Sequence, residues 1–127
     1  MFAIVVGMQE VLSLIVPTEV LKHFDYEKHS EQSGVYLIEL VEKDDLDHIP
    51  KAILREGKVV LNGFMNSVDL QTYPLQGKEV FLRLKRRRWR LKNDESKKSY
   101  FNEYDFAYPG IKATKAFGAF LKEIGRG

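Results

Sequence analysis

The chain has 127 residues, of which 44% are hydrophobic, 12% aromatic and 30% charged. These proportions indicate one globular domain, which at this length buries roughly two-thirds of its unfolded surface, and they exclude intrinsic disorder. The absence of cysteine excludes disulfides, thiolate zinc sites and cysteine nucleophiles. Because no apolar run approaches the ~20 residues of a membrane-spanning helix, we expect a cytoplasmic protein with no membrane partner.

The formal net charge of +2 hides an uneven distribution along the chain. Residues 1–77 contain 6 Lys or Arg and 12 Asp or Glu, so their net charge is −6. Residues 78–92 contain 8 Lys or Arg and a single acidic residue, Glu79, which gives a net charge of +7. This basic segment is the main indication of function, because a dense run of cations favours a polyanionic partner.

The first part of the chain, residues 1–33, is predicted to be a helical segment. The apolar residues Met8, Val11, Leu12 and Ile15 are spaced at i, i+3, i+4 and i+7. This spacing is the apolar stripe of a short helix, which we expect to end before Pro17. The hydroxyl of Thr18 is suited to capping a second short helix, which we expect to extend to Phe24. The polar residues 27–33 are predicted to form a loop.

Residues 34–108 are predicted to form a small antiparallel sheet of three to five strands. The β-branched and aromatic run Val35–Val41 predicts a strand that is covered on both faces. Further strands are expected at Lys58–Phe64, Val68–Tyr73, Lys78–Leu91 and Ser99–Phe106. Residues 109–127 are predicted to form a C-terminal amphipathic helix with apolar positions Phe117, Phe120, Leu121 and Ile124. The expected fold is therefore one α+β domain.

The hydrophobic alternation of the long basic strand fails partway along it. Over residues 80–85, apolar side chains on one face alternate with Phe81, Arg83 and Lys85 on the other, which is the pattern of a half-buried strand. Over residues 85–90 cations occupy both faces, and a folded core cannot bury unpaired guanidinium groups. We therefore expect this end to leave the sheet edge or to form a protruding hairpin tip that contacts nucleic-acid phosphates.

Two features of the basic segment have more than one interpretation. A basic edge strand also protects a sheet from edge-to-edge aggregation, and the acidic residues 1–77 can pair with it inside the same domain. Trp89 is either a buried anchor that holds the hairpin, which we favour, or a platform on which a base stacks.

Weaker candidates lie after the basic strand. Four lysines flank the polar turn and the start of the last helix: Lys97, Lys98, Lys112 and Lys115. They are either solvated or bind phosphate, which the free N–H groups of a helix N-terminus help to hold. The aromatic residues Tyr100, Phe101, Tyr104, Phe106 and Tyr108 either stack on bases or form core and cross-strand packing, which is more usual at strand spacing.

No catalytic constellation is visible in the sequence. His23, His29 and His48 lack the spacing of metal ligands. The glycines form no phosphate-binding loop, and the serines occupy no nucleophile elbow. We therefore expect a protein without enzymatic activity, metal or cofactor.

The order of features from Val68 to Ile124 resembles a known family. The run VDLQTYPLQGKEV leads into FLRLKRRRWR, and a polar turn, an aromatic strand and a helix that begins ATKAFGAFL follow. This order resembles the N-terminal region of bacterial insertion-sequence transposases of the DDE type, in which a zinc-ribbon-like β module precedes a helix-turn-helix and a catalytic RNase H-like domain. The resemblance implies DNA binding in transposition, a form of DNA recombination by mobile elements, through recognition of transposon ends.

The chain departs from that family in two ways. The zinc-ribbon relatives carry cysteine pairs before and after the basic strand, whereas residues 49–57 and 92–98 contain none. The resemblance therefore implies a metal-free version that its apolar core and flanking helices hold together. The catalytic domain has no counterpart within the 127 residues, so the chain resembles a truncated product, a separately encoded N-terminal half or an isolated domain. A separately encoded half implies a separate catalytic transposase chain as its partner.

The expected function is non-catalytic binding of double-stranded DNA. One or two arginines are expected to contact guanine edges in the major groove, and the other cations to contact phosphates. The residues expected to form this interface are Arg83, Lys85, Arg86, Arg87, Arg88, Trp89, Arg90, Lys92, Lys97, Lys98, Lys112 and Lys115. Two alternatives stay open. One is a binder of single-stranded nucleic acid or RNA, and the other is a protein-interaction module whose basic hairpin docks on an acidic partner or on a second copy in a homodimer.

Overall fold

The computed structural model describes residues 2–44, 46, 49–96 and 98–125. Its elements are, in chain order, helices α1 (Phe2–Ile15) and α2 (Thr18–Leu21), strands β1 (Phe24–Gln32) and β2 (Val35–Glu42), helix α3 (Lys51–Glu56), strands β3 (Val59–Phe64), β4 (Val68–Leu75), β5 (Lys78–Lys85) and β6 (Arg87–Leu91), and helix α4 (Lys115–Ile124). The expected α+β class is confirmed. Among the described residues, no helix is long and apolar enough to cross a membrane.

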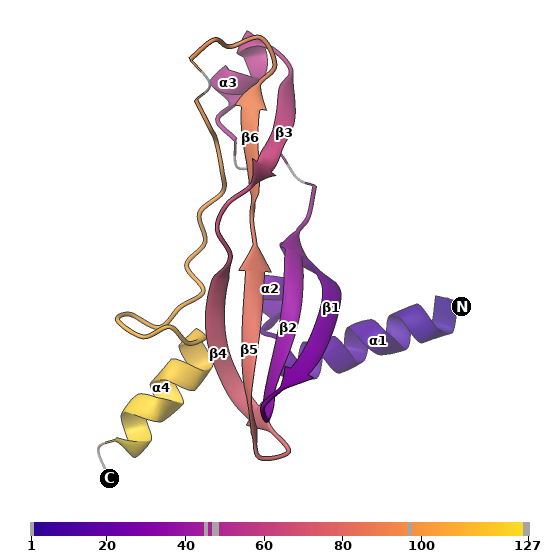
Figure 1. Cartoon of the computed structure of the whole chain (residues 1–127), viewed down its shortest axis with the longest axis vertical. Helices are drawn as coiled ribbons and strands as arrows, with labels where there is room; N and C mark the ends of the chain where they lie inside the picture. The colour runs from indigo at the N-terminus through magenta and orange to yellow at the C-terminus, as the bar shows by residue number, and fades with distance from the viewer. Residues whose placement is uncertain (1, 45, 47–48, 97, 126–127) are drawn as a thin grey trace.

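The strands form two sheets that follow one another along the long axis of the molecule (Figure 1). The larger sheet has the order β1-β2-β5-β4, and the smaller one pairs β3 with β6. Strands β2 and β5 are parallel, whereas the other neighbouring strands are antiparallel. The larger sheet is therefore mixed, because the chain leaves it after β2, builds α3 and β3, and re-enters it through the β4–β5 hairpin.

Both hairpins of the larger sheet turn through two residues. Ser33 and Gly34 join β1 to β2, and Gln76 and Gly77 join β4 to β5. All four residues have positive φ, between 53° and 78°. Positive φ at both central positions is the signature of a type I′ turn, whose twist matches that of paired strands.

Two predictions for the first half of the sheet are wrong. The predicted loop over residues 27–33 lies mostly in β1, an edge strand in which only Phe24 is buried. Polar residues fit there because an edge strand leaves much of its surface in water. Strand β2 is buried only at Ile38, Leu40 and Glu42, so its other face is half-buried and not covered by a second layer.

Three further predictions differ from the structure. The long strand Lys78–Leu91 is divided at Arg86 into β5 and β6, and the expected strand Ser99–Phe106 contains only an isolated bridge at Tyr100. Helix α3 was not predicted, because its six residues carry too few apolar positions to show a periodicity. Helix α2 ends at Leu21, and its N-cap is Pro17 without a side-chain hydrogen bond, so Thr18 is not the cap.

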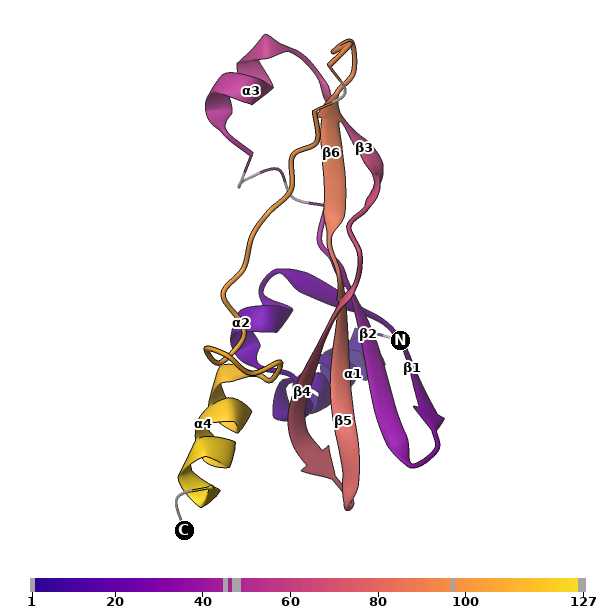
Figure 2. The ribbon, with the colours of Figure 1, turned by 60° about the vertical axis from the view of Figure 1, so that its left-hand side comes forward.

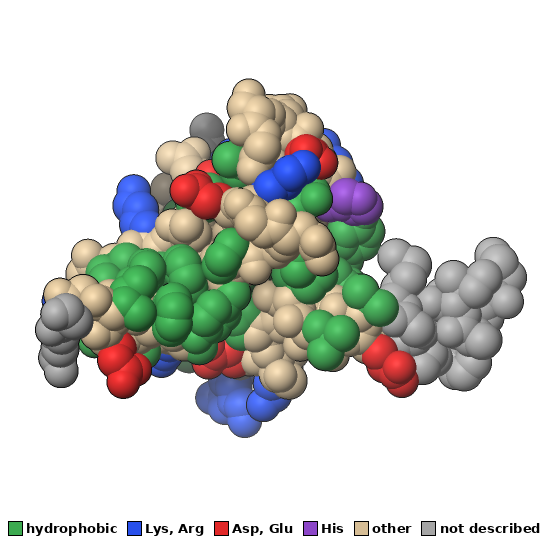
Figure 3. Space-filling view, turned by 90° about the horizontal axis from the view of Figure 1, so that it is seen from below, with side chains coloured by type: hydrophobic (Ala, Val, Ile, Leu, Met, Phe, Trp, Pro, Cys, Tyr) green, Lys and Arg blue, Asp and Glu red, His purple; other side chains and the backbone are tan. Residues whose placement is uncertain are grey.

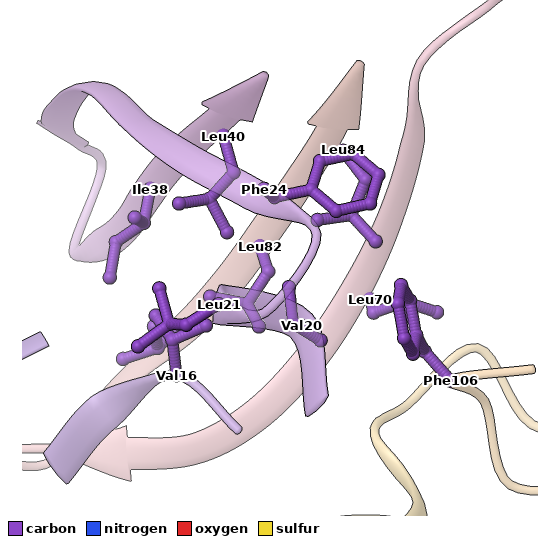
Figure 4. Close-up of a cluster of buried hydrophobic side chains, with 11 residues drawn as sticks. Val16, Val20, Leu21, Phe24, Ile38, Leu40, Leu70, Leu82, Leu84 and Phe106 are labelled. Atoms are coloured by element: carbon purple, nitrogen blue, oxygen red, sulfur yellow. The ribbon is translucent and has the colours of Figure 1, made fainter. Parts of the chain in front are cut away.

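The main core lies between one face of the larger sheet and helix α2 (Figure 4). The alternation predicted for β5 is confirmed, because Val80, Leu82 and Leu84 are buried in this core. Its other members are Val16, Val20, Leu21, Phe24, Ile38, Leu40, Leu70 and Phe106. Phe106 comes from the irregular segment before α4, which therefore contributes packing without being a strand.

Helix α4 packs on the outer edge of the larger sheet and leaves an apolar surface at the lower end of the molecule. Thr114 caps the helix by accepting a hydrogen bond from the backbone N–H of Phe117 (3.4 Å). The ring of Phe117 is buried and meets Tyr73 of β4 edge-on, with 5.1 Å between centroids. Phe120 and Ile124 remain exposed, and Figure 3 shows the apolar side chains that gather on this end.

Candidate nucleic-acid interface

The basic segment forms a spine that runs from the larger sheet into the smaller one. Strand β5 continues through Arg86 into β6, which pairs with β3 in the register Val59↔Leu91, Val60↔Arg90 and Leu61↔Trp89. We call the pair β3–β6 the ribbon; it projects beyond the larger sheet, with α3 to one side (Figure 2). The expectation that the basic end leaves the sheet is confirmed, although its partner is β3 and not a returning strand.

The other edge of β6 carries a short contact with the segment that follows it. The N–H of Trp89 donates to the carbonyl of Tyr100 (2.8 Å), and the N–H of Tyr100 donates back (2.7 Å). Strand β6 is therefore flanked on both sides at its centre. This position leaves its two faces, and not its edges, as the surfaces from which side chains can reach a partner.

The two faces of β6 differ in burial. Trp89 and Leu91 are 5% and 7% exposed, and Leu91 Cδ2 lies 4.0 Å from the position of a Cβ built on Gly57, the residue that ends α3. The anchor interpretation of Trp89 is confirmed: its indole is buried, and within the described residues its N–H has no hydrogen-bond partner, so packing holds it in place. By strand alternation, Arg88 and Arg90 lie on the opposite face.

The cations of β5 are compensated by carboxylates. The Nε and Nη2 atoms of Arg83 donate to the two carboxylate oxygens of Asp69 at 2.9 and 3.0 Å, and this hydrogen bonding raises the pKa of Arg83. Lys85 Nζ lies 3.5 Å from a carboxylate oxygen of Glu27. Acidic residues from the first part of the chain therefore do pair with the basic segment, but only along β5.

Four arginines beyond β5 have a different environment. In the part of the chain that the structure describes, Arg86, Arg87, Arg88 and Arg90 have no carboxylate oxygen within 4.0 Å of their guanidinium nitrogens. Each one instead donates to a backbone carbonyl: Arg86 to Asn102 (2.9 Å), Arg87 to Glu42 (2.9 Å), Arg88 to Asn62 (2.8 Å) and Arg90 to Lys92 (3.1 Å). We call these the carbonyl-anchored arginines. A carbonyl orients a guanidinium but carries no net charge, so the positive charge stays uncompensated.

Aromatic rings add a second constraint at the junction of the two sheets, which we call the waist. The guanidinium carbon of Arg86 lies 5.2 Å from the ring centroid of Phe101, and that of Arg87 lies 5.7 Å from the centroid of Phe64. Lys85 Nζ approaches Phe64 as well, at 5.1 Å. Cation–π contacts of this kind fix the direction of a cation without neutralising it.

A buried carboxylate at the waist was not predicted from the sequence. The side chain of Glu42, 1% exposed, accepts hydrogen bonds from the backbone N–H of Arg87 (2.8 Å), from Asn102 Nδ2 (3.0 Å) and from the hydroxyl of Tyr104. It joins the end of β2 to the start of β6 and to the segment before α4. The signal in the sequence was its place in the alternation after Ile38 and Leu40, which puts it on the buried face.

The remaining candidate residues are divided between two places. Lys92 and Lys98 are exposed and follow β6; the Lys98 ammonium lies 5.5 Å from the ring centroid of Tyr100. Lys97 lies outside the described residues. Lys112 and Lys115 lie at the start of α4 beside β4, where Lys115 Nζ is 3.2 Å from Asp105. The structure therefore does not bring the lysines of α4 to the ribbon.

The aromatic residues after β6 differ in whether they pack in the core or are exposed. Tyr104 and Phe106 stack at 4.9 Å between centroids, and Phe106 meets Phe24 of the core at 6.0 Å, which confirms core packing for this pair. Phe101 is 37% exposed beside Arg86. Of the five aromatic residues, Phe101 is exposed, Phe106 is buried, and Tyr100, Tyr104 and Tyr108 are half-buried.

Among the described residues, no group of three or more His, Asp or Glu side chains has an arrangement that holds a metal ion. A cavity of about 660 Å³ lies between α1 and the larger sheet and has an apolar lining that includes Val11, Ile15 and Tyr36.

Comparisons with protein-family models, with curated proteins and with solved structures give no match to this chain.

Proposed function

We propose that this protein is a non-catalytic DNA-binding domain that holds double-stranded DNA against the ribbon. The observation that carries the proposal is the set of carbonyl-anchored arginines, which brings four uncompensated charges together on a projecting element. Mutual repulsion of these charges is relieved by phosphates, and their contacts release the counterions condensed on DNA. The resemblance to transposase N-terminal regions extends the proposal to recognition of transposon ends, with a separate catalytic chain as partner.

The structure also limits which cations contribute. Arg83 and Lys85 already face carboxylates of their own chain, so a phosphate that approaches them must compete with Asp69 and Glu27. Within the described residues, the carbonyl-anchored arginines have no carboxylate partner that a phosphate would have to displace. Because their guanidinium groups are already oriented, less conformational entropy is lost when they bind.

The test is a titration of the full chain with a fluorescent mixed-sequence duplex at two salt concentrations, about 50 and 200 mM. Four to five phosphate contacts from the waist, the ribbon and the exposed lysines after it predict a slope of about −4 in log K against log salt concentration. Absence of duplex binding at the lower salt concentration would contradict the proposal.

A matched pair of double variants assigns the binding to the ribbon. Arg88→Ala with Arg90→Ala removes two cations that no carboxylate of the described chain pairs, so duplex affinity should fall at both salt concentrations. Arg83→Ala with Lys85→Ala removes the same formal charge from the same spine, but these cations are ion-paired, so duplex affinity should fall by much less. Equal effects in the two variants would exclude the ribbon as the specific interface. Circular dichroism of each variant checks that it is folded.

Single-stranded nucleic acid is the second candidate, because Phe64 and Phe101 are 38% and 37% exposed beside cations. Exposed rings next to basic groups are the arrangement on which unpaired bases stack. Competition distinguishes the two ligands. Unlabelled duplex should displace the bound duplex at a lower concentration than a single strand of the same length; the reverse order would assign the site to single strands.

A further inference from the structure

Two arginines of β6, Arg88 and Arg90, lie on the face of the ribbon that is opposite α3. They project from β6 on this face by strand alternation, and Val60 of β3 pairs with Arg90. The register shifts between Leu61 and Phe64, and within this irregularity the Asn62 carbonyl accepts from Arg88. Gly63 has no side chain, and a Cβ built there would lie 3.3 Å from Nη2 of Arg88, so the surface beneath this guanidinium is low. We call this surface the open face.

Each of these arginines keeps one pair of adjacent N–H groups for a partner. Arg88 uses Nε for the carbonyl of Asn62 (2.8 Å), so its Nη1 and Nη2 groups remain as an end-on pair. Arg90 uses Nη1 for the carbonyls of Leu91 (3.4 Å) and Lys92 (3.1 Å), so its Nε and Nη2 groups remain as a side-on pair. Two adjacent donors match the O6 and N7 acceptors of guanine, which only the major groove exposes together.

The spacing of Arg88 and Arg90 along the backbone of β6 matches the repeat of DNA. Residues i and i+2 of a strand lie about 6.8 Å apart along its axis, and two base-pair steps of B-DNA span about the same distance. A two-stranded ribbon also fits the major groove, about 12 Å wide, and not the minor groove, about 6 Å wide. Trp89 does not supply the aromatic wedge that many minor-groove binders insert, because it faces away from the open face and is buried.

We propose that the open face enters the major groove and that Arg88 and Arg90 contact two guanines separated by one base pair. This inference rests on the proposed DNA binding and adds where the protein binds and which bases it selects. The waist arginines, Arg86 and Arg87, then lie where the spine rejoins the larger sheet and contact the phosphates that border the groove. Base contact and phosphate contact are thereby assigned to different members of the carbonyl-anchored set.

The groove is tested by competition on a mixed-sequence duplex. Methyl green occupies the major groove and netropsin the minor groove, so methyl green should displace the full chain at concentrations at which netropsin leaves it bound. Displacement by netropsin alone would overturn the major-groove assignment while leaving DNA binding established. Absence of duplex binding would instead overturn the proposed function itself.

The bases are tested by selection from a pool of random duplexes. The enriched duplexes should share two guanines separated by one base pair. Replacement of either guanine by 7-deazaguanine, which lacks the N7 acceptor, should weaken binding by about 10-fold, the loss expected when one bidentate contact becomes a single hydrogen bond. Enrichment of A·T runs, or an unchanged affinity for the 7-deazaguanine duplex, would overturn the inference.

A charge-preserving variant separates base contact from general attraction. Arg88→Lys keeps the positive charge but loses the pair of donors, so one of the two guanines should no longer be selected while the salt slope stays unchanged. Arg83→Lys is the matched control: it makes the same exchange on an ion-paired residue of β5 and should leave the selected sequence unchanged. An unchanged selection with Arg88→Lys would exclude this residue from base contact.

Discussion

Arginines at neighbouring positions of one continuous spine differ according to the group that each guanidinium contacts. Arg83 meets the carboxylate of Asp69 through two hydrogen bonds, whereas Arg88 meets only the carbonyl of Asn62. Both groups accept hydrogen bonds, but only the carboxylate cancels the charge. A count of basic residues along the spine therefore overstates the charge available to a polyanion, because the arginines without an ion pair lie at the waist and in the ribbon.

Gly63, which lies beside Arg88, and Gly34 share a backbone conformation but differ in their surroundings. Gly63 and Gly34 have the same φ of +78°, so alanine at either position should lower the free energy of unfolding by about 1–2 kcal/mol through left-handed backbone strain. A Cβ at Gly63 would also lie 3.3 Å from Nη2 of Arg88, whereas a Cβ at Gly34 would meet nothing within 4 Å. Only Gly63→Ala should therefore weaken DNA binding.

Denaturant unfolding and duplex titration of both glycine variants provide the measurement. Gly34→Ala is the control for strain alone. If the two variants lowered duplex affinity equally, the position of Arg88 over Gly63 would not matter for binding.

At the scale of elements, the last residue of β2 determines how the two sheets meet. Glu42 accepts three hydrogen bonds from groups in β6 and in the segment before α4, inside a buried junction. Its loss removes the carboxylate that these groups share as an acceptor, and a buried donor that loses its acceptor costs about 1–3 kcal/mol. We therefore predict that Glu42→Ala lowers the free energy of unfolding by about 4 kcal/mol.

Glu27→Ala is the matched control for this prediction. The Glu27 side chain is 37% exposed and lies 3.5 Å from Lys85, a surface ion pair whose removal should change the free energy of unfolding by less than about 1 kcal/mol. Guanidinium denaturation of both variants gives the comparison. A loss as small for Glu42→Ala as for Glu27→Ala would show that the junction does not depend on this carboxylate.

The elements also differ in how far the sequence predicted them. Strand β5 was predictable because its apolar alternation is a local property that any half-buried strand requires. Strand β1 was not, because its polar residues Glu27–Gln32 resemble a loop and become a strand only by pairing with β2. The segment 99–106 showed the opposite error: its aromatic residues resemble a strand, but they pack on the core and at the waist without a continuous strand partner.

At the scale of the whole molecule, the two sheets have unequal support. Strand β5 has partners on both sides and buries three side chains in the main core, whereas the two strands of the ribbon together bury only Trp89 and Leu91. Regions with fewer buried apolar contacts open more often. The amides of β3 and β6 should therefore exchange hydrogen faster than those of β5.

Hydrogen exchange of the full chain, with and without a mixed-sequence duplex, measures this difference. If DNA binds the ribbon as proposed, bound duplex should slow exchange in β3 and β6 and leave β5 nearly unchanged. Uniform exchange of all three strands in the free protein would show instead that the two sheets open as one cooperative unit.

Local patterns in the chain were sufficient for the α+β class, for the buried face of β5, for the anchor role of Trp89 and for the departure of the basic end from the sheet. Each depends on neighbouring residues, because strand alternation and the cost of burying a guanidinium act over a few positions. The tertiary structure decided the parallel pairing of β2 with β5, the junction at Glu42 and which arginines keep their charge. These depend on groups that folding brings within about 4 Å from distant parts of the chain, and an ion pair or hydrogen bond acts only at that range.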